Sequence, residues 1–232
     1  MKRIFGSLLS AVTLFGACCF GFNAVGAEEA AKEPEAASVA SNEKKDTELV
    51  FIVDKSGSMW NLTKDTIGSF NNLLDTQKND TENGGAYVTT VMFNGKHEKI
   101  HDRKNIQEVE HITDKDYRPN GCTALLDAVG DTITELSKNE AIKDHKVVVA
   151  IITDGYENAS REYNRQQVKD LIASKEKEGW KFVFCGANID EVAEGKKIGL
   201  RKESIVGFSA TGEGVRNVYD EVSQRMTEAR AL

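Results

Sequence analysis

The sequence contains no cluster of basic residues and none of the common motifs of hydrolases and nucleotide-binding enzymes. Its 30 Lys and Arg residues are spread along 232 positions and are outnumbered by 37 Asp and Glu, which gives a formal net charge of −7. Proteins that bind a nucleic-acid backbone concentrate positive charge, so nucleic acid is not an expected partner. A GxxxxGK[ST] phosphate loop, a GxSxG elbow and an HExxH helix are missing, which disfavours the enzyme classes that use them.

Cysteines are too few to build a disulfide framework. Four occur, and Cys18 and Cys19 fall in an apolar N-terminal stretch, which leaves Cys122 and Cys185 for the rest of the chain. A bridge between these two is an open alternative in an oxidising compartment. Cys185 ends a very apolar run, however, and this favours a buried free thiol.

The N-terminal stretch has the pattern of an export signal. Met1-Lys2-Arg3 is followed by the uncharged residues 4–27, which end in Val25-Gly26-Ala27 before two glutamates. This predicts a signal peptide over residues 1–27 and a secreted, periplasmic or otherwise extracytoplasmic protein. Two alternatives remain: an uncleaved membrane anchor, or a lipoprotein acylated at Cys18. Cleavage after Ala27 would leave 28 basic and 37 acidic residues, a net charge of −9.

A linker precedes the part of the chain that can fold. Residues 28–46 contain one apolar residue larger than alanine, Val39, so they are expected to form a disordered, acidic and Ala-rich linker. From Thr47 onward, short apolar runs alternate with segments of helical spacing, which is typical of a layered α/β sheet. The runs 49–53, 147–152 and 182–185 are nearly continuous, as in central parallel strands covered on both faces.

The remaining segments complete an open α/β sheet. Residues 86–93 and 96–103 flank Asn94-Gly95, which predicts an antiparallel hairpin with a two-residue type I′ turn and a polar second strand at the sheet edge. In such sheets, ligands bind outside the carboxyl ends of the strands, where the strand order reverses. Helices are predicted by apolar residues spaced three or four apart, at Ile67, Phe70 and Leu74, at Leu125, Val129, Ile133 and Leu136, at Val168, Leu171 and Ile172, and at Val215, Val218, Val222 and Met226.

Three predicted loops carry oxygen-bearing side chains. Asp54-Lys55-Ser56-Gly57-Ser58 follows the run 49–53 directly, and alternate side chains there point the same way. Thr153-Asp154-Gly155 follows the run 147–152, although an ordinary Asp-Gly turn would look the same. Thr123 precedes a predicted helix, where it is equally suited to be a helix N-cap.

The side chains in these loops match the ligands of a hard divalent cation. Mg²⁺ takes six oxygen ligands in an octahedron and keeps some water, whereas Ca²⁺ accepts six to eight in a looser geometry. Five side chains supply fewer than six ligands, so an incoming carboxylate could fill a remaining position. The ligand set does not discriminate Mg²⁺ from Mn²⁺ or Ca²⁺. The five candidate metal ligands are Asp54, Ser56, Ser58, Thr123 and Asp154.

These residues resemble the metal-ion-dependent adhesion site (MIDAS) of the von Willebrand factor A (vWA) domain. The resemblance rests on Asp54-x-Ser56-x-Ser58, Thr123 and Asp154-Gly155, in that order, and covers residues 47–232. It implies a vWA, Rossmann-like, open and mostly parallel six-stranded sheet with one antiparallel edge strand and helices on both faces. It also implies that Ser56, Ser58 and Thr123 contact the ion, most simply Mg²⁺, while Asp54 and Asp154 act directly or through water.

The function implied is an exported, bacterial, non-catalytic adhesion module. The metal would capture an Asp or Glu carboxylate of a partner protein, and a membrane would be involved only through an N-terminal anchor or lipid. Two alternative functions remain open. A metal-dependent hydrolase or phosphatase of the haloacid-dehalogenase type would need an acid where Ser56 stands. A non-catalytic subunit of a larger assembly is the other alternative, although cytoplasmic versions do not fit an export signal.

Other residues lie close to the motif in the sequence. Flanking side chains could shape partner specificity, although they could equally be ordinary loop residues. Three histidines, at positions 97, 101 and 111, are candidate ligands of a zinc site. No cysteine accompanies them, so histidines on a solvated surface are the simpler interpretation. The flanking residues considered for partner binding are Lys55, Met59, Trp60, Tyr156 and Glu157.

Overall fold

A computed structural model of the chain describes residues 44–187 and 190–232. The predicted signal peptide and residues 28–43 of the predicted linker lie outside the described residues. The described residues form one α/β unit, in which the chain alternates between strands and helices as the sequence pattern predicts.

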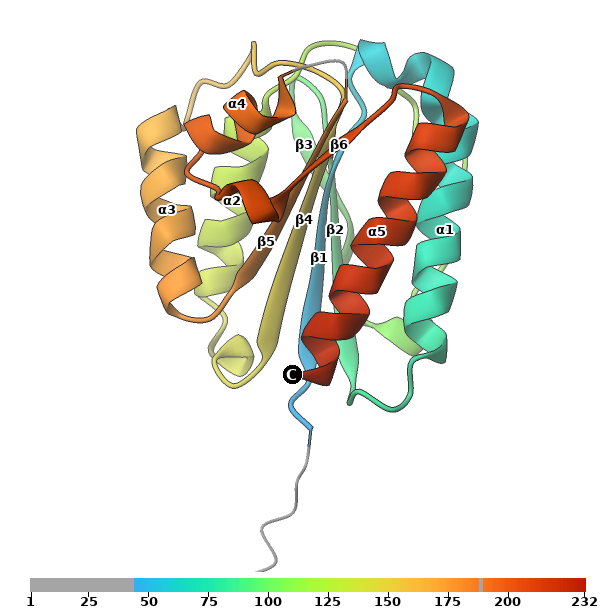
Figure 1. Cartoon of the computed structure of the whole chain (residues 1–232), viewed down its shortest axis with the longest axis vertical. Helices are drawn as coiled ribbons and strands as arrows, with labels where there is room; N and C mark the ends of the chain where they lie inside the picture. Colours follow the sequence, from blue (N-terminus) through green and yellow to red (C-terminus); the bar gives the residue numbers. More distant parts are fainter. Residues whose placement is uncertain (1–43, 188–189) are drawn as a thin grey trace, which may run out of the picture. The chain divides into compact units, whose positions relative to one another are not determined.

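A six-stranded sheet runs through the centre of this unit (Figure 1). Its order is β3-β2-β1-β4-β5-β6, and every neighbouring pair is parallel except β2 and β3. The predicted mostly parallel sheet with one antiparallel edge strand is therefore confirmed. The strands are β1 (Thr47–Asp54), β2 (Ala86–Phe93), β3 (His97–Asn105), β4 (Lys146–Thr153), β5 (Lys181–Ala187) and β6 (Ile205–Phe208).

The strand order reverses between β1 and β4. From β1 the chain continues through β2 to β3 at one edge, and from β4 it continues through β5 to β6 at the other. Such a switch point opens a crevice at the carboxyl ends of the two strands, because the connections leave in opposite directions. The loops after Asp54 and Thr153 both start there.

The β2–β3 hairpin differs from the prediction in its turn. Phe93 pairs with His97, so the connection has three residues rather than two. Neither Asn94 nor Gly95 has a positive φ, which a type I′ turn would require at both positions. The Asn94 side chain explains the difference, because its Oδ1 accepts a hydrogen bond from the Lys96 amide and closes the turn locally.

Helices cover both faces of the sheet (Figure 1), as predicted. The long helices α1 and α5 pack together on one face, and α2 and α3 lie on the other. The sequence pattern did not locate strand β6, the short helix α4 or the 3₁₀ helices, among them η1 (Gly57–Leu62), which links β1 to α1. The helices are α1 (Thr63–Asn79), α2 (Leu125–Ser137), α3 (Arg165–Lys177), α4 (Glu191–Lys197) and α5 (Gly212–Ala231).

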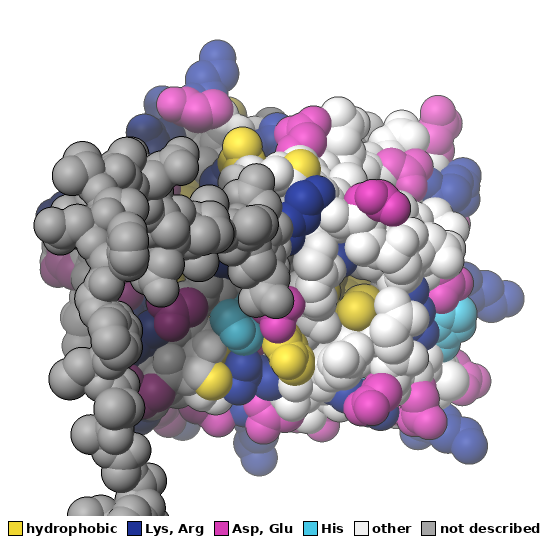
Figure 2. Space-filling model, turned by 90° about the horizontal axis from the view of Figure 1, so that it is seen from below, with side chains coloured by type: hydrophobic (Ala, Val, Ile, Leu, Met, Phe, Trp, Pro, Cys, Tyr) yellow, Lys and Arg dark blue, Asp and Glu magenta, His cyan; other side chains and the backbone are white. Residues whose placement is uncertain are grey.

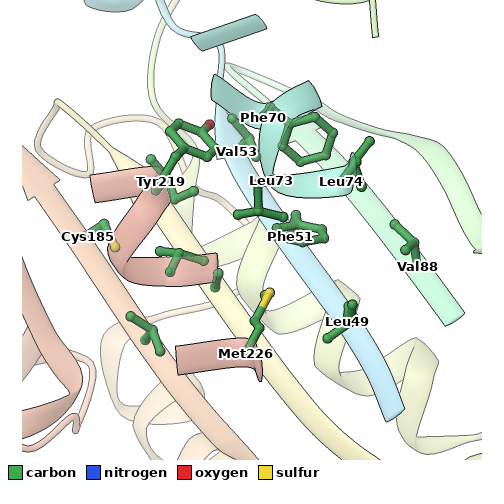
Figure 3. Packing of buried hydrophobic residues seen from close by; sticks show 14 of the residues in the cluster. Leu49, Phe51, Val53, Phe70, Leu73, Leu74, Val88, Cys185, Tyr219 and Met226 are labelled. Atoms are coloured by element: carbon green, nitrogen blue, oxygen red, sulfur yellow. The ribbon is translucent and has the colours of Figure 1, made fainter. Parts of the chain in front are cut away.

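Alternate residues of β1 serve two separate cores. Leu49, Phe51 and Val53 face α1 and α5, whereas Val50 and Ile52 face α2 and α3. Figure 3 shows the first core, in which the Phe51 ring meets Phe70 edge-on at a centroid distance of 5.1 Å. Burial of β1 on both faces explains its continuous apolar run.

Both ends of the described chain lie at the amino ends of the strands. Asp46 accepts a hydrogen bond from the Gly85 amide, and Arg230 donates one to the Gly84 carbonyl at 3.0 Å. The Lys146 ammonium donates to the Arg230 carbonyl. Figure 2 views this end of the unit, where acidic and basic side chains intersperse over the described residues that are visible.

The two cysteines of the described chain are free thiols. Cys185 is buried in β5, as the apolar run predicts, and burial raises its pKa to about 12. Cys122 is exposed in the loop before α2. The alternative of a bridge between them is therefore wrong for this structure.

Candidate metal site

Asp54 is the last residue of β1 and is fully buried. Its Oδ1 accepts a hydrogen bond from the Ser56 amide at 2.6 Å, and its Oδ2 accepts one from the Thr153 hydroxyl at 2.6 Å. Thr153 ends β4, next to β1, so the switch point brings both residues together. The sequence places Thr153 in the third loop, directly after an apolar run, but does not indicate its contact with Asp54.

The two serines and Asp154 form a chain of hydrogen bonds across the crevice. The hydroxyls of Ser56 and Ser58 lie 3.1 Å apart, and the Ser58 hydroxyl donates to Asp154 Oδ1 at 2.5 Å. Residues at positions 54, 56 and 58 therefore converge, as the predicted alternation of side chains requires. The candidate ligands after β1 and those after β4 are within direct contact of one another.

Gly155 marks the space on which the candidate ligands converge. A methyl group placed on its Cα would lie 3.3 Å from the Thr123 hydroxyl, 3.6 Å from the Ser58 hydroxyl and 4.0 Å from Asp54 Oδ2. A side chain here would occupy the space between these oxygens, whereas glycine leaves it open. The structure thus brings all five predicted ligand residues together.

Thr123 does not cap the following helix, which removes the alternative role considered for it. Helix α2 begins at Leu125, and its N-cap is Ala124. The carboxylate of Glu157 accepts a hydrogen bond from the Leu126 amide instead, and so satisfies one of the free N–H groups at the helix start. The Thr123 hydroxyl is left to face the crevice.

Asn158 holds the backbone of Thr123 on both sides. The Asn158 side-chain Oδ1 accepts a hydrogen bond from the Thr123 backbone N–H at 2.9 Å. The Asn158 backbone N–H donates to the Thr123 carbonyl at 3.0 Å. Asn158 belongs to the loop that begins with Asp154, so these bonds tie two ligand-bearing loops together. The sequence did not indicate this contact with Thr123.

We expect Asn158→Ala to weaken Mg²⁺ binding by about 10- to 100-fold, as is typical when a partner that orients a metal ligand is lost. Isothermal titration calorimetry with Mg²⁺ measures the effect. Asn139→Ala is the matched control, because Asn139 also accepts a backbone hydrogen bond but lies before β4, at the opposite end of the sheet. Equal Mg²⁺ affinities in the Asn158→Ala and wild-type proteins would contradict the role given to Asn158.

Further backbone bonds fix the loop that carries Thr123. The Gly57 amide donates to the Gly121 carbonyl at 3.1 Å, and the Asn120 amide donates to the Lys55 carbonyl at 2.8 Å. Gly121 has a φ of 74°, a left-handed conformation that favours glycine. The buried Tyr117 hydroxyl donates to the Asp54 carbonyl at 2.6 Å. The first and second loops are therefore connected by main-chain contacts.

Without a cation, the crevice disfavours the ionised forms of Asp54 and Asp154. Burial raises the pKa of Asp54 to about 6, although hydrogen bonds from Thr153 and Ser56 oppose the shift. Burial also raises the pKa of Asp154. A bound divalent cation would stabilise the ionised form of both groups.

The residues present fit such a cation. The crevice offers two carboxylates and three hydroxyls, all of them oxygen donors of the kind that Mg²⁺, Mn²⁺ and Ca²⁺ accept. Within the described residues there is no group of three or more His, Cys, Asp or Glu that could hold a metal ion. The site is therefore distinguished by its hydroxyls rather than by an acidic cluster.

The residues predicted to flank the site have different environments. Tyr156 and Trp60 are 53% and 66% exposed. Met59 is fully buried in the core that faces α1 and α5, so its side chain does not reach a partner, contrary to the prediction. Lys55 is half-buried and forms an ion pair with Glu98. The Glu157 carboxylate is engaged at the start of α2, as described above.

The three histidines do not converge. His97 lies 3.3 Å from Asp131, His111 lies 2.8 Å from Asp75, and His101 contacts the Thr90 hydroxyl. His101 is only 7% exposed, which corrects the expectation that all three are solvated. Burial lowers the pKa of His101 and favours its neutral form.

The fold and the crevice define an open α/β-sheet domain with an oxygen-rich site at its switch point. The sequence profile of the von Willebrand factor type A domain matches residues 48–221. The chain therefore belongs to the von Willebrand factor type A domain family. A search of curated protein sequences gives no match.

Solved structures with the same fold include a byssus protein, a pilus adhesin and a protein loaded with manganese. Proximal thread matrix protein 1 from the mussel byssus matches with a TM-score of 0.58 and 17% identity, over 79% of this chain and 47% of that one. The pilus adhesin SpaC from Lactobacillus rhamnosus GG matches with a TM-score of 0.63 and 11% identity, over 79% and 30%. The manganese-loaded Plasmodium vivax TRAP protein matches with a TM-score of 0.56 and 16% identity, over 78% and 72%. This chain thus spans about half the length of the mussel protein, and at these identities the likeness concerns the fold.

Proposed function

We propose that this protein is an exported, non-catalytic binding module that captures an acidic residue of a partner protein through a divalent cation. The observation that carries the proposal is the convergence of Asp54, Ser58 and Thr123 oxygens on Gly155, with Ser56 and Asp154 hydrogen-bonded to Ser58. Family membership supports a protein-binding role, and the manganese-loaded relative supports a divalent cation. Mg²⁺ is the proposed ion, with Mn²⁺ or Ca²⁺ as alternatives.

Each of the five candidate ligands would have a defined role in holding the cation. Asp54 and Asp154 would balance the charge of the cation, while Ser56, Ser58 and Thr123 would hold it through neutral oxygens. A bound cation supplies positive charge and a coordination position that a partner carboxylate can complete. Three of the five donors are uncharged, so less of the positive charge is neutralised by the protein itself. The exposed Tyr156 and the half-buried Lys55 lie in the ligand-bearing loops and are proposed to contact the partner.

The same geometry argues against a phosphatase. An aspartate that attacks phosphorus needs an accessible oxygen, but Asp54 is fully buried and both of its oxygens accept hydrogen bonds. Ser56 also stands where that mechanism needs its second acid. The proposed role of Asp54 is therefore that of a ligand.

We also propose that the protein is bacterial and is exported by its N-terminal segment, residues 1–27. Secretion or periplasmic release, retention of a membrane anchor and lipidation at Cys18 are the forms of export to be compared. In the described part of the chain no helix is long and apolar enough to cross a membrane.

A pull-down from a native cell extract tests the proposed function. The immobilised protein is expected to retain a partner in Mg²⁺, to release it in EDTA and to recover it when Mg²⁺ is restored. Asp154→Ala is expected to retain none, whereas Asp144→Ala, an exposed acid before β4, should behave as wild type. A partner that is retained in EDTA and by Asp154→Ala alike would contradict the proposal.

A further inference from the structure

We propose that a pocket beside the metal site receives a large apolar side chain from the same partner segment that supplies the metal-binding carboxylate. The pocket, called here the Trp60 pocket, has a volume of about 690 Å³ and is lined by Trp60, Ile67, Tyr117 and Pro119 together with polar neighbours. The inference rests on the proposed function, because the carboxylate would position the segment over the pocket.

Trp60 is the first reason to regard this surface as a contact site. In the described chain the exposed large hydrophobic residues are Trp60 at 66%, Tyr156 at 53% and Leu232 at 82%. Trp60 and Tyr156 each follow a candidate metal ligand by two residues, Ser58 and Asp154. Tryptophan and tyrosine are enriched among residues that dominate binding energy when a partner buries them.

The pocket and the metal site share structural elements. Ser58 and Trp60 both belong to η1, and a 3₁₀ helix rises about 2 Å per residue, so the two residues are close along its axis. Tyr117 lines the pocket, and its hydroxyl donates to the carbonyl of Asp54. A ligand seated against Trp60 would therefore lie beside the crevice rather than on a separate face.

The charges around the pocket favour an acidic partner. Lys64 and Arg118 line it together with Asp65 and Asp114, and the Asp65 carboxylate is already paired with Arg216 at 2.8 Å. Arg216 lies outside the lining and neutralises Asp65, so the lining carries two basic side chains, Lys64 and Arg118, and one remaining acidic one, Asp114. The pocket thus has a small excess of positive charge in a chain whose net charge is −7, which suits a segment that carries Asp or Glu.

The size of the pocket and the alternation of side chains along an extended chain define the occupant. Pockets of about 300–1,000 Å³ hold small organic ligands, so the Trp60 pocket has room for an aromatic or large aliphatic side chain. An extended chain advances about 3.3–3.6 Å per residue, and its side chains alternate in direction. We therefore infer an extended segment with Asp or Glu and, two or four residues away, a Trp, Phe, Tyr, Leu or Met.

Peptide selection tests the inference. A library of random peptides displayed on phage is selected on the immobilised full chain in Mg²⁺, and a selected peptide is then synthesised for affinity measurement. We expect an acidic residue and a large apolar residue at a fixed offset. Trp60→Ala should weaken the binding of the synthetic peptide about tenfold or more without changing the affinity of the protein for Mg²⁺. Leu232→Ala, which removes an exposed hydrophobic residue at the opposite end of the sheet, should change neither.

The outcomes separate the pocket from the metal site. Selected peptides that carry an acid and need Mg²⁺, but show no apolar preference or are unaffected by Trp60→Ala, would overturn the pocket and leave the proposed function standing. Peptides that bind equally well in EDTA and to Asp154→Ala would overturn the proposed function, and the shared segment with it.

Discussion

Asp154→Asn is expected to abolish measurable Mg²⁺ binding. The substitution preserves the shape of the side chain and removes one of the two negative charges in the crevice. Loss of a partner that only orients a ligand typically costs about 10- to 100-fold in metal affinity, so loss of a charged ligand should exceed that range. Calorimetric titration with Mg²⁺ checks the result, and Asp144→Asn makes the same charge change on an exposed residue at the opposite end of the sheet.

Thermal unfolding of the same variant distinguishes a ligand from a structural carboxylate. Burial raises the pKa of Asp154, so its ionised form is held at a cost in free energy when no cation is bound. In EDTA, Asp154→Asn should therefore melt at the wild-type temperature or above it. With Mg²⁺ at a hundred times its Kd, only the wild-type protein should gain stability, by about 2.7 kcal/mol. A clear loss of stability for the variant in EDTA would contradict the assignment.

Arg230→Met is expected to lower the free energy of unfolding by about 3–5 kcal/mol. Arg230 is 1% exposed, and its guanidinium donates to the carbonyl oxygens of Gln77, Asp80 and Gly84 at 2.8, 2.8 and 3.0 Å. It also lies 3.3 Å from the Asp80 carboxylate. Methionine can fill much of the volume but donates no hydrogen bond, so these acceptors lose their partner.

Urea denaturation measures this effect. Arg201→Met is the matched control, because the Arg201 side chain is 71% exposed and only approaches Glu176 at 3.9 Å. Its effect should stay within about 0.5 kcal/mol, as is usual for exposed substitutions. A similarly small effect of Arg230→Met would contradict the prediction, because it would mean that the packing of α5 does not depend on these bonds to α1 and to the loop between α1 and β2.

The central sheet could be predicted from the sequence because its signals are local. Strands β1 and β4 are buried on both faces, which leaves continuous apolar runs, and α2 shows regular apolar spacing. Strand β6 has four residues, of which none is fully buried, so it carries no such run. The type I′ turn was a wrong inference from Asn94-Gly95, because the Asn94 side chain closes a three-residue turn.

Four of the five candidate ligands were predictable because they follow a strand end, whereas Thr123, which precedes a helix, was indicated by the resemblance to the vWA motif. Asp54 and Asp154 each follow an apolar run, and the spacing of Ser56 and Ser58 places them on the same side. Asn158 lies in an irregular loop and contacts Thr123 across 35 positions, so only the folded chain reveals it. Met59 was misplaced because a motif does not show which of its neighbours turn inward.

The position of the chain ends has a practical consequence. Lys44 and Asp46, just before β1, are hydrogen-bonded to the loop between α1 and β2. Arg230, near the end of α5, is hydrogen-bonded to the same loop. The candidate site lies at the other end of the strands. A tag, a fusion partner or a solid support joined at either end of the described unit, residues 44–232, would therefore start on the side away from the crevice. The unit could also be inserted into a loop of a host protein, since its ends are close together.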